Sequence, residues 1–199
     1  MSSNPTSRIV LVTGPARSGK SEWAERLAHT SGQAVTYVAT AAVDASDADW
    51  VARIQNHQQR RPATWQTMEL SLELPEAIAT CPPDTCLLID SLGTWIVHYL
   101  EQDEEHWQIV VMTLLNALHA TAGAIIFVSE ETGWGVIPAY PSGRLFRDRL
   151  GSLTRQIAAL ADAVYLVTAG YALDLRHLGH CIAEKVADPW DERPYPHTK

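Results

Sequence analysis

The sequence predicts an α/β fold, in which a single domain holds a mostly parallel β-sheet flanked by helices. Short β-branched, apolar runs alternate along the chain with longer stretches of helical periodicity, as in parallel sheets. The segment Gly14-Pro-Ala-Arg-Ser-Gly-Lys-Ser21 joins the first such run to the first helical stretch. At 199 residues, the chain is long enough to bury one full core.

The first strand and the first helix lie on either side of this segment. Residues 8–13 form a short β-branched run typical of a buried strand. In residues 22–28, Trp23 and Leu27 stand four positions apart and therefore share one face of a helix. A strand, a glycine-rich turn and a helix in this order are the context in which the motif G-x-x-x-x-G-K-[ST] binds phosphate.

The motif predicts a site for a nucleoside triphosphate. Glycine lets backbone N–H groups curl around phosphate oxygens, and the helix N-terminus adds partial positive charge. Lys20 is expected to reach the β- and γ-phosphates as a catalytic residue, and the Ser21 hydroxyl to ligate Mg²⁺. The predicted phosphate contacts are Gly14, Pro15, Ala16, Arg17, Ser18, Gly19, Lys20 and Ser21. The alternative, a glycine-rich turn with a chance Lys-Ser, is disfavoured by the flanking strand and helix.

The remaining elements continue the alternation. Predicted strands cover residues 34–40, 86–90, 124–129 and 163–169, and the last of these is expected to close the sheet. Predicted helices cover residues 46–60, 94–100, 104–121 and 144–160. The first of these helices begins with Ser46 and Asp49 at capping-box spacing and is expected to stop before Pro62.

The predicted domain covers residues 8–186. Residues 1–7 are expected to form a flexible N-terminus, and they are polar and too short for a signal peptide. Residues 187–199 carry 3 prolines and no periodicity, which predicts a poorly ordered tail.

Composition limits the classes of protein to which the chain can belong. The formal net charge of −8 argues against a general nucleic-acid binder, which would present a basic surface. The chain has no apolar run long enough to span a membrane. The spacing Cys81-Pro-Pro-Asp-Thr-Cys86 fits no common zinc pattern, so the 3 cysteines are expected to be reduced thiols in the cytoplasm.

Asp90 is a candidate metal-supporting residue. It ends the apolar run at residues 86–90, downstream of the phosphate motif. An aspartate at the carboxyl end of a buried strand in this position commonly supports Mg²⁺. The alternative is an ordinary aspartate that begins a turn.

His57 is a candidate nucleophile. On a helix it lies four positions after Arg53, three before Arg60 and four before Arg61, so one face gathers a histidine and arginines. Nearby positive charge keeps an imidazole neutral, and guanidinium groups hold phosphate oxygens. A neutral imidazole can attack phosphorus to form a covalent intermediate. On the residues alone, a solvated basic helix face with an exposed histidine is the favoured interpretation.

Further segments, taken with the phosphate motif, resemble one known family. They are Tyr37-Val-Ala-Thr40, Arg53-Ile-Gln-Asn-His57 with Arg60, Arg61, Pro62 and Trp65, Thr67-Met-Glu69, Leu87-Leu-Ile-Asp90 with Trp95, Glu131-Thr-Gly-Trp-Gly-Val-Ile-Pro138, Arg144, Phe146-Arg-Asp148 and Gly151. With these segments in this order, from about residue 8 to residue 175, the chain resembles the bifunctional adenosylcobinamide kinase/adenosylcobinamide-phosphate guanylyltransferase family of cobalamin biosynthesis.

The resemblance implies an activity in two steps. A nucleoside triphosphate, ATP or GTP, phosphorylates the aminopropanol hydroxyl of adenosylcobinamide. GTP then guanylylates a histidine, which corresponds to His57, and the GMP passes to adenosylcobinamide phosphate to give adenosylcobinamide-GDP. A P–N bond keeps GMP activated for transfer, and two displacements replace one difficult step.

The resemblance also implies the rest of the site and the assembly. The residues that it places at the GTP are Ala39, Thr40, Ala41, Gln58, Gln59, Arg60 and Arg61, completed by Glu69 and Asp90. It further implies the RecA-like branch of P-loop NTPase folds and a homo-oligomer, a trimer. The expected partners are adenosylcobinamide, its phosphate and nucleoside triphosphates.

Two positions depart from the family pattern. Glu130 stands where the family commonly has asparagine, and an acid that faces phosphates would repel them. Gln58 replaces a common arginine, whose charge Arg60 and Arg61 are expected to supply.

Two other functions stay open: a P-loop kinase of another small molecule with His57 on its surface, and a nucleotide-dependent regulatory or binding module.

Overall fold

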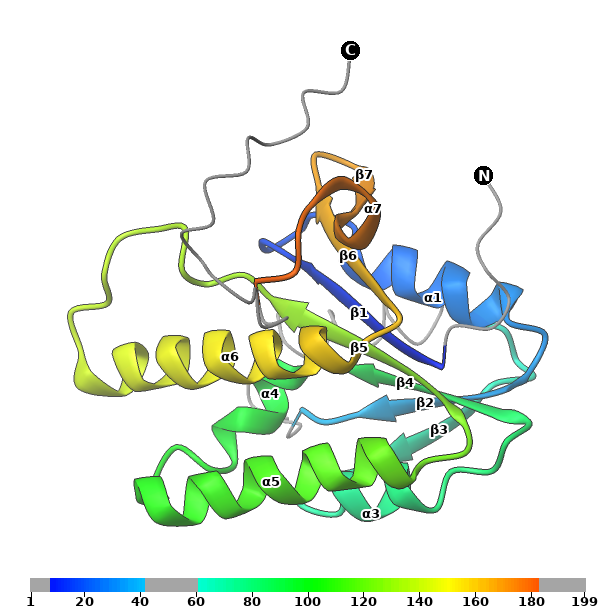
Figure 1. Cartoon of the computed structure of the whole chain (residues 1–199), viewed down its shortest axis with the longest axis horizontal. Helices are drawn as coiled ribbons and strands as arrows, with labels where there is room; N and C mark the ends of the chain where they lie inside the picture. The colour runs from blue at the N-terminus through cyan, green and yellow to red at the C-terminus, as the bar shows by residue number, and fades with distance from the viewer. Residues whose placement is uncertain (1–7, 42–60, 183–199) are drawn as a thin grey trace, which may run out of the picture.

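The computed structural model describes residues 8–41 and 61–182, which form a β-sheet with helices on both faces (Figure 1). Within these residues the sheet has 7 strands, in the order β3-β2-β4-β5-β1-β6-β7. The strands are β1 (Ile9–Gly14), β2 (Ala34–Ala39), β3 (Gln66–Glu69), β4 (Thr85–Asp90), β5 (Ala124–Glu130), β6 (Ala163–Thr168) and β7 (Tyr171–Asp174). Every neighbouring pair is parallel except β6 and β7, which are antiparallel. The predicted α/β class is confirmed.

Two hydrophobic layers enclose the sheet. Helix α1 (Lys20–Thr30) covers one face, and the other face is covered by α3 (Leu74–Ala79), α4 (Leu92–Val97), α5 (Glu104–Ala120) and α6 (Pro141–Leu160). Alternate residues of each strand serve the two layers: in β1, Leu11 packs on the α6 side and Val12 on the α1 side. Burial on both faces explains the continuous apolar runs in the sequence. No helix in the described part of the chain is long and apolar enough to cross a membrane.

The carboxyl ends of the parallel strands meet at one edge of the sheet. Gly14 pairs with Glu130 across β1 and β5, while Ala39 pairs with both Asp90 and Glu69 across β2, β4 and β3. Strand β5 lies between β1 and β4. The phosphate motif and Asp90 therefore share this edge, with β5 between their two strands.

The prediction that residues 163–169 close the sheet is wrong. After β6, Ala169 and Gly170 turn the chain with positive φ angles of 49° and 79°, and β7 pairs with β6 as an antiparallel edge strand. The short elements β3, α3, β7 and α7 (Leu175–Leu178) have 4 to 6 residues each. Their sequences are too short to show a period, and so the pattern did not predict them.

Two predicted helices have shifted ends. Helix α4 begins at Leu92 rather than residue 94 because the Ser91 side chain accepts a hydrogen bond from the Thr94 backbone N–H, and it ends at Val97 rather than residue 100. Helix α6 begins at Pro141 rather than residue 144, since proline suits a first helical turn. The helix predicted at residues 46–60, the N-terminus at residues 1–7 and the tail at residues 187–199 lie outside the described residues.

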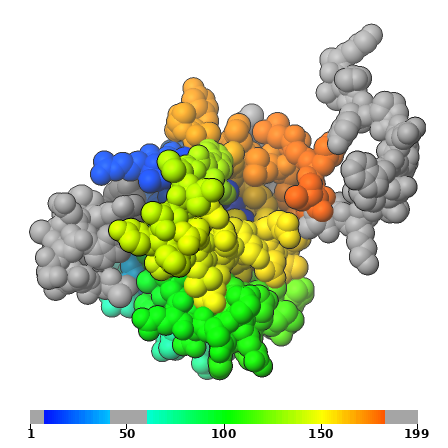
Figure 2. Space-filling view, turned by 90° about the vertical axis from the view of Figure 1, so that its left-hand side faces the viewer, coloured from blue at the N-terminus to red at the C-terminus, as the bar shows by residue number. Residues whose placement is uncertain are grey.

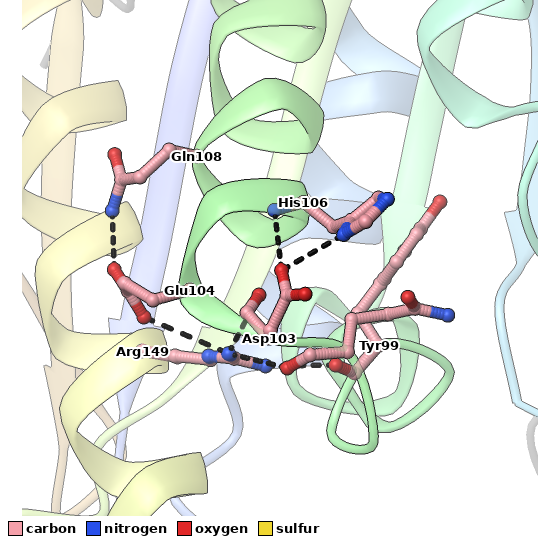
Figure 3. Close-up of polar contacts among 7 residues, drawn as sticks. Tyr99, Asp103, Glu104, His106, Gln108 and Arg149 are labelled. Carbon is pink, nitrogen blue, oxygen red and sulfur yellow. Dashed lines mark hydrogen bonds and ion pairs between the residues drawn. The ribbon is translucent and has the colours of Figure 1, made fainter.

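Arg149 joins α6 to the turn between α4 and α5 (Figure 3). This arginine is only 5% exposed, and it donates hydrogen bonds to the carbonyl oxygens of Tyr99 at 2.7 Å and Gln102 at 2.8 Å. Its guanidinium also lies 5.0 Å from the ring centroid of Trp107, within the range of a cation–π contact. The turn therefore receives from α6 hydrogen-bond donors for its carbonyl oxygens, in addition to the Gln102 N–H that bonds to Tyr99.

Candidate nucleotide-binding site

The phosphate motif forms a loop that turns its backbone toward the start of α1. Arg17 and Gly19 have positive φ angles of 58° and 94°, and Gly19 is the N-cap of α1. Successive N–H groups in such a conformation form a concave site for anions, which the helix N-terminus strengthens. A Cβ atom on Gly14 would overlap the carbonyl oxygen of Val167, so only glycine fits where the loop leaves β1.

Lys20 and Ser21 open α1 beside this loop. Lys20 is buried, and its Nζ donates to the carbonyl oxygen of Pro15 at 3.4 Å. The Ser18 hydroxyl is buried and has no hydrogen-bond partner among the described residues. Because buried hydroxyl groups are nearly always paired, this orphan group fits a loop that is built to surround a phosphate.

Asp90 lies at the end of β4 on the α1 face of the sheet. Its neighbour on that face, Leu88, packs in the same hydrophobic layer as α1, and alternate residues share a face. The hydroxyl of Tyr37 donates to Asp90 Oδ2 at 3.0 Å. A carboxylate and a serine hydroxyl are hard oxygen donors of the kind that Mg²⁺ prefers, so Asp90 and Ser21 fit a magnesium site.

Tyr37 connects Asp90 with Arg61. The Arg61 guanidinium carbon lies 3.2 Å from the centroid of the Tyr37 ring, which is a close cation–π contact. Burial, followed by the nearby Asp90 carboxylate, raises the pKa of Tyr37 above its ordinary value, so the hydroxyl remains protonated and donates. The family resemblance includes Tyr37, but the sequence assigned it no role in the site, because a tyrosine in a strand is typical of an ordinary core position.

Thr40 is fixed at the carboxyl end of β2. Its hydroxyl donates to the Ser91 carbonyl oxygen at 2.7 Å and accepts from the Ser91 backbone N–H at 3.0 Å. The Thr40 carbonyl oxygen also lies 3.0 Å from Nε2 of His98. Thr40 therefore positions the turn that follows Asp90, and its side chain is buried rather than open to a ligand.

Glu130 does not present a free carboxylate to the phosphates. Its two oxygens accept hydrogen bonds from the Ser91 hydroxyl and from the Gly93 backbone N–H at the start of α4. A carboxylate at a helix N-terminus is stabilised by the helix dipole. Glu130, the acid that departs from the family pattern, therefore holds the start of α4 against β5.

The structure brings several predicted site residues to one edge and leaves others undescribed. Ala39 lies between Glu69 and Asp90 in register, although Glu69 is exposed at the end of an edge strand. Ala41 follows Thr40 at the same edge. His57, Gln58, Gln59 and Arg60 lie outside the described residues, so their predicted roles remain predictions.

Glu131 is a further residue at the site. Its side chain accepts from the Thr13 hydroxyl at 2.8 Å, and its backbone N–H donates to the Gly14 carbonyl oxygen at 2.9 Å. The family resemblance includes this residue, but only the pairing of β5 with β1 shows that it adjoins the phosphate loop.

The site combines strand β1, the phosphate loop, helix α1 and, two strands away, the acid Asp90. These parts together define a P-loop nucleotide-binding domain. A solved protein of Pyrococcus horikoshii OT3 has a similar fold, with a TM-score of 0.52 at 9% identity, over 84% of this chain and 85% of that one. At such low identity the likeness shows the fold alone.

Sequence comparison identifies the family. Residues 10–175 match the model of the cobinamide kinase / cobinamide phosphate guanyltransferase family, and the chain belongs to this family of enzymes. It is 40% identical to a bifunctional adenosylcobalamin biosynthesis protein of Pseudomonas aeruginosa, over 83% of this chain and 96% of the relative. It is 34% and 33% identical to proteins of the same description from Salmonella typhimurium and Escherichia coli, over 84% of this chain and 99% of each relative. The resemblance inferred from the sequence is confirmed.

Proposed function

We propose that this enzyme phosphorylates adenosylcobinamide and then transfers GMP from GTP, through guanylylated His57, to adenosylcobinamide phosphate. The observation that carries the proposal is the phosphate loop of Gly14–Ser21, with its buried Lys20 and unpaired Ser18 hydroxyl, in a chain of this family. A module that only binds nucleotide is disfavoured, because the relatives are described as bifunctional biosynthesis proteins.

The kinase step depends on the edge of the sheet near β1. The oxygen of the aminopropanol hydroxyl bonds to the γ-phosphorus, the bond to the β–γ bridging oxygen breaks, and the nucleoside diphosphate leaves as the hydroxyl loses its proton. Lys20 neutralises charge on the transferred group, which is where P-loop enzymes obtain most of their rate enhancement. The donor is ATP or GTP.

We assign Ser21 and Asp90 to Mg²⁺. The ion, when bound, would neutralise the developing charge on the phosphates. Asp90 is held for this task by the hydroxyl of Tyr37, while Ser21 is at the start of α1.

The GMP step depends on His57. Its imidazole nitrogen bonds to the α-phosphorus of GTP and pyrophosphate leaves; a phosphate oxygen of the acceptor then attacks the same phosphorus, and the P–N bond breaks. Arg61, seated on Tyr37, supports this assignment because it places a cation beside the nucleotide edge, four positions from His57 along the chain. The proposed nucleotide contacts are the loop Gly14–Ser21, Ala39, the backbone of Thr40, Ala41, Gln58, Gln59, Arg60, Arg61, Glu69 and Asp90.

We further propose a homotrimer, in line with the family resemblance, and a cytoplasmic location. All three cysteines, Cys81, Cys86 and Cys181, are free thiols, which suits a reducing compartment.

The test is to incubate the protein with labelled GTP and Mg²⁺ and to search for a covalent GMP adduct by mass spectrometry. We expect an adduct that is labile in acid and stable in alkali, located on His57. A protein that phosphorylates adenosylcobinamide without forming this adduct would be a kinase only. A protein that binds GTP and does neither reaction would refute the proposal.

A further inference from the structure

The loop between β5 and α6, residues 131–140, turns apolar side chains to solvent. Trp134 is 61% exposed and Val136 is 94% exposed, and Ile137 and Tyr140 are exposed as well. Figure 1 shows this loop reaching out from the carboxyl end of β5, and Figure 2, which faces that side, shows it (yellow-green) at the front of the molecule. Isolated exposed apolar residues are common, but a group of large ones on one loop marks a contact surface.

The loop is fixed at both of its ends. At its start, the backbone N–H of Glu131 donates to the carbonyl oxygen of Gly14 in the phosphate loop at 2.9 Å. At its end, Arg144 Nη1 donates to the carbonyl oxygens of Pro138 at 3.0 Å and Ala139 at 2.7 Å. The apolar residues between these anchors are therefore held in a defined relation to the triphosphate site.

A cavity of about 280 Å³ lies at the base of the loop, between the sheet and α6. Its wall includes Thr13, Glu131, Thr132, Gly151 and Arg155. The wall also includes Glu130, Arg147 and apolar side chains such as that of Val164, so the cavity combines apolar surface with charges of both signs. Thr13 and Glu131 also adjoin Gly14, so the cavity reaches the strand end from which the phosphate loop starts.

We propose that the loop and the cavity together form the acceptor site for the corrinoid. The aminopropanol arm enters the cavity, and the apolar face of the corrin ring rests on Trp134, Val136 and Ile137. The arm's hydroxyl must approach the γ-phosphorus to about 3–3.5 Å, which requires an acceptor site at this edge of the sheet. Arg155 offers a cation to the phosphate that the arm carries in the second step.

The combination of surfaces favours a corrinoid over a second copy of the chain. A corrinoid has a broad ring and one slender aminopropanol arm, and this site has a broad exposed loop beside a cavity whose Arg147 and Arg155 can pair with a phosphate on the arm. An interface between copies would use the apolar loop but would have no use for the cavity beneath it.

The proposal rests on the proposed function and is tested with a double variant, Trp134→Ala with Ile137→Ser. We expect its dissociation constant for adenosylcobinamide, measured by equilibrium dialysis, to rise about tenfold from the loss of buried apolar surface. GMP adduct formation from GTP should stay at the wild-type rate, because that half-reaction needs no acceptor. Tyr171→Ser, which removes an exposed aromatic residue on β7, is the control and should leave both measurements unchanged.

A second pair of variants tests the cavity. A Cβ at Gly151 meets no atom within 4 Å, so Gly151→Leu should fill the cavity without disturbing α6, whereas Gly151→Ala adds only a methyl group. We expect Gly151→Leu to weaken adenosylcobinamide binding at least tenfold and Gly151→Ala to bind nearly as the wild type does.

Three results separate this proposal from the proposed function. A wild-type protein that forms no GMP adduct contradicts the proposed function itself. Wild-type affinity for adenosylcobinamide in both the loop variant and Gly151→Leu, with adduct formation intact, overturns the acceptor site alone. A loop variant with reduced mass by light scattering and unchanged corrinoid affinity would assign the loop to an interface between copies, and this also overturns the acceptor site.

Discussion

Lys20 is the residue on which both proposed reactions depend. It is buried at the first position of α1, where its amine faces the phosphate loop and donates to Pro15. We expect Lys20→Ala to lower kinase activity and adduct formation by about a hundred- to a thousandfold, because charge stabilisation in the transition state is lost. Steady-state kinetics and adduct yield measure the two losses. Arg26→Ala, which removes an exposed cation from the same helix, is the control and should change neither.

Tyr37 donates a hydrogen bond that helps to orient Asp90. We expect Tyr37→Phe to keep the contact with Arg61 but to lose the hydrogen bond to Asp90, and so to raise the Mg²⁺ concentration for half-maximal activity about two- to tenfold. Calorimetric titration of Mg²⁺ into the protein–nucleotide complex should show the same shift. Asp90→Asn should shift both curves further, since it removes the carboxylate itself.

The control for Tyr37 is another tyrosine of the same sheet. Tyr165 packs edge-to-face on Trp23, with ring centroids 5.5 Å apart, and Tyr165→Phe also removes one hydroxyl group. Its Mg²⁺ titration should match the wild type. Equal shifts in the two variants, or no shift in Tyr37→Phe, would reduce Tyr37 to a packing residue.

At the scale of the elements, Arg149 is the clearest stabilising contact. We expect Arg149→Met, which nearly preserves volume, to lower the free energy of unfolding by about 2–4 kcal/mol, because the carbonyl oxygens of Tyr99 and Gln102 each lose a donor and the cation–π contact with Trp107 is lost. Urea unfolding measures the change. Glu104 lies 3.6 Å from Arg149 but is mostly exposed, so Glu104→Gln should cost less than about 1 kcal/mol. A loss as large as that of Arg149→Met would show that the ion pair, and not the carbonyl contacts, stabilises the turn.

The elements differ in how far the sequence predicts them. Buried central strands such as β1 and β5 are predicted nearly to the residue, because burial on both faces leaves a continuous β-branched run. The edge strands β3 and β7 are 4 residues long and partly exposed, so their sequences carry no such run. At the start of α4, backbone N–H groups donate to the side chains of Ser91 and Glu130. Glu130 is far from α4 along the sequence, so a local sequence pattern cannot predict its contact.

At the scale of the whole molecule, the strand order determines which contacts in the site can be predicted from the sequence. The motif itself predicts the phosphate loop, and a strand-ending aspartate predicts Asp90. The contacts between Tyr37 and Asp90, and between Glu131 and Gly14, join residues 53 and 117 positions apart, because β2 pairs with β4 and β5 with β1. Such contacts follow from the order β2-β4-β5-β1, which the alternation of elements does not determine.

The two reactions are expected to separate at His57. The proposed kinase step relies on Lys20, Ser21 and Asp90, which lie at the same edge of the sheet, and a γ-phosphoryl group that passes to a hydroxyl needs no protein nucleophile. GMP transfer through nitrogen needs an imidazole, which asparagine cannot replace. We therefore expect His57→Asn to abolish the GMP adduct and guanylyl transfer while phosphorylation of adenosylcobinamide remains measurable.

The measurement compares His57→Asn with a second histidine variant. His119 is an exposed residue of α5 whose ring bonds to the Leu115 carbonyl oxygen of its own helix, and His119→Asn should keep both reactions. Adduct formation that persists in His57→Asn would place the nucleophile on another residue. Loss of both reactions in a variant whose circular dichroism and unfolding midpoint match the wild type would mean that His57 also serves the kinase step, and that the two reactions share more of the site than the phosphate loop.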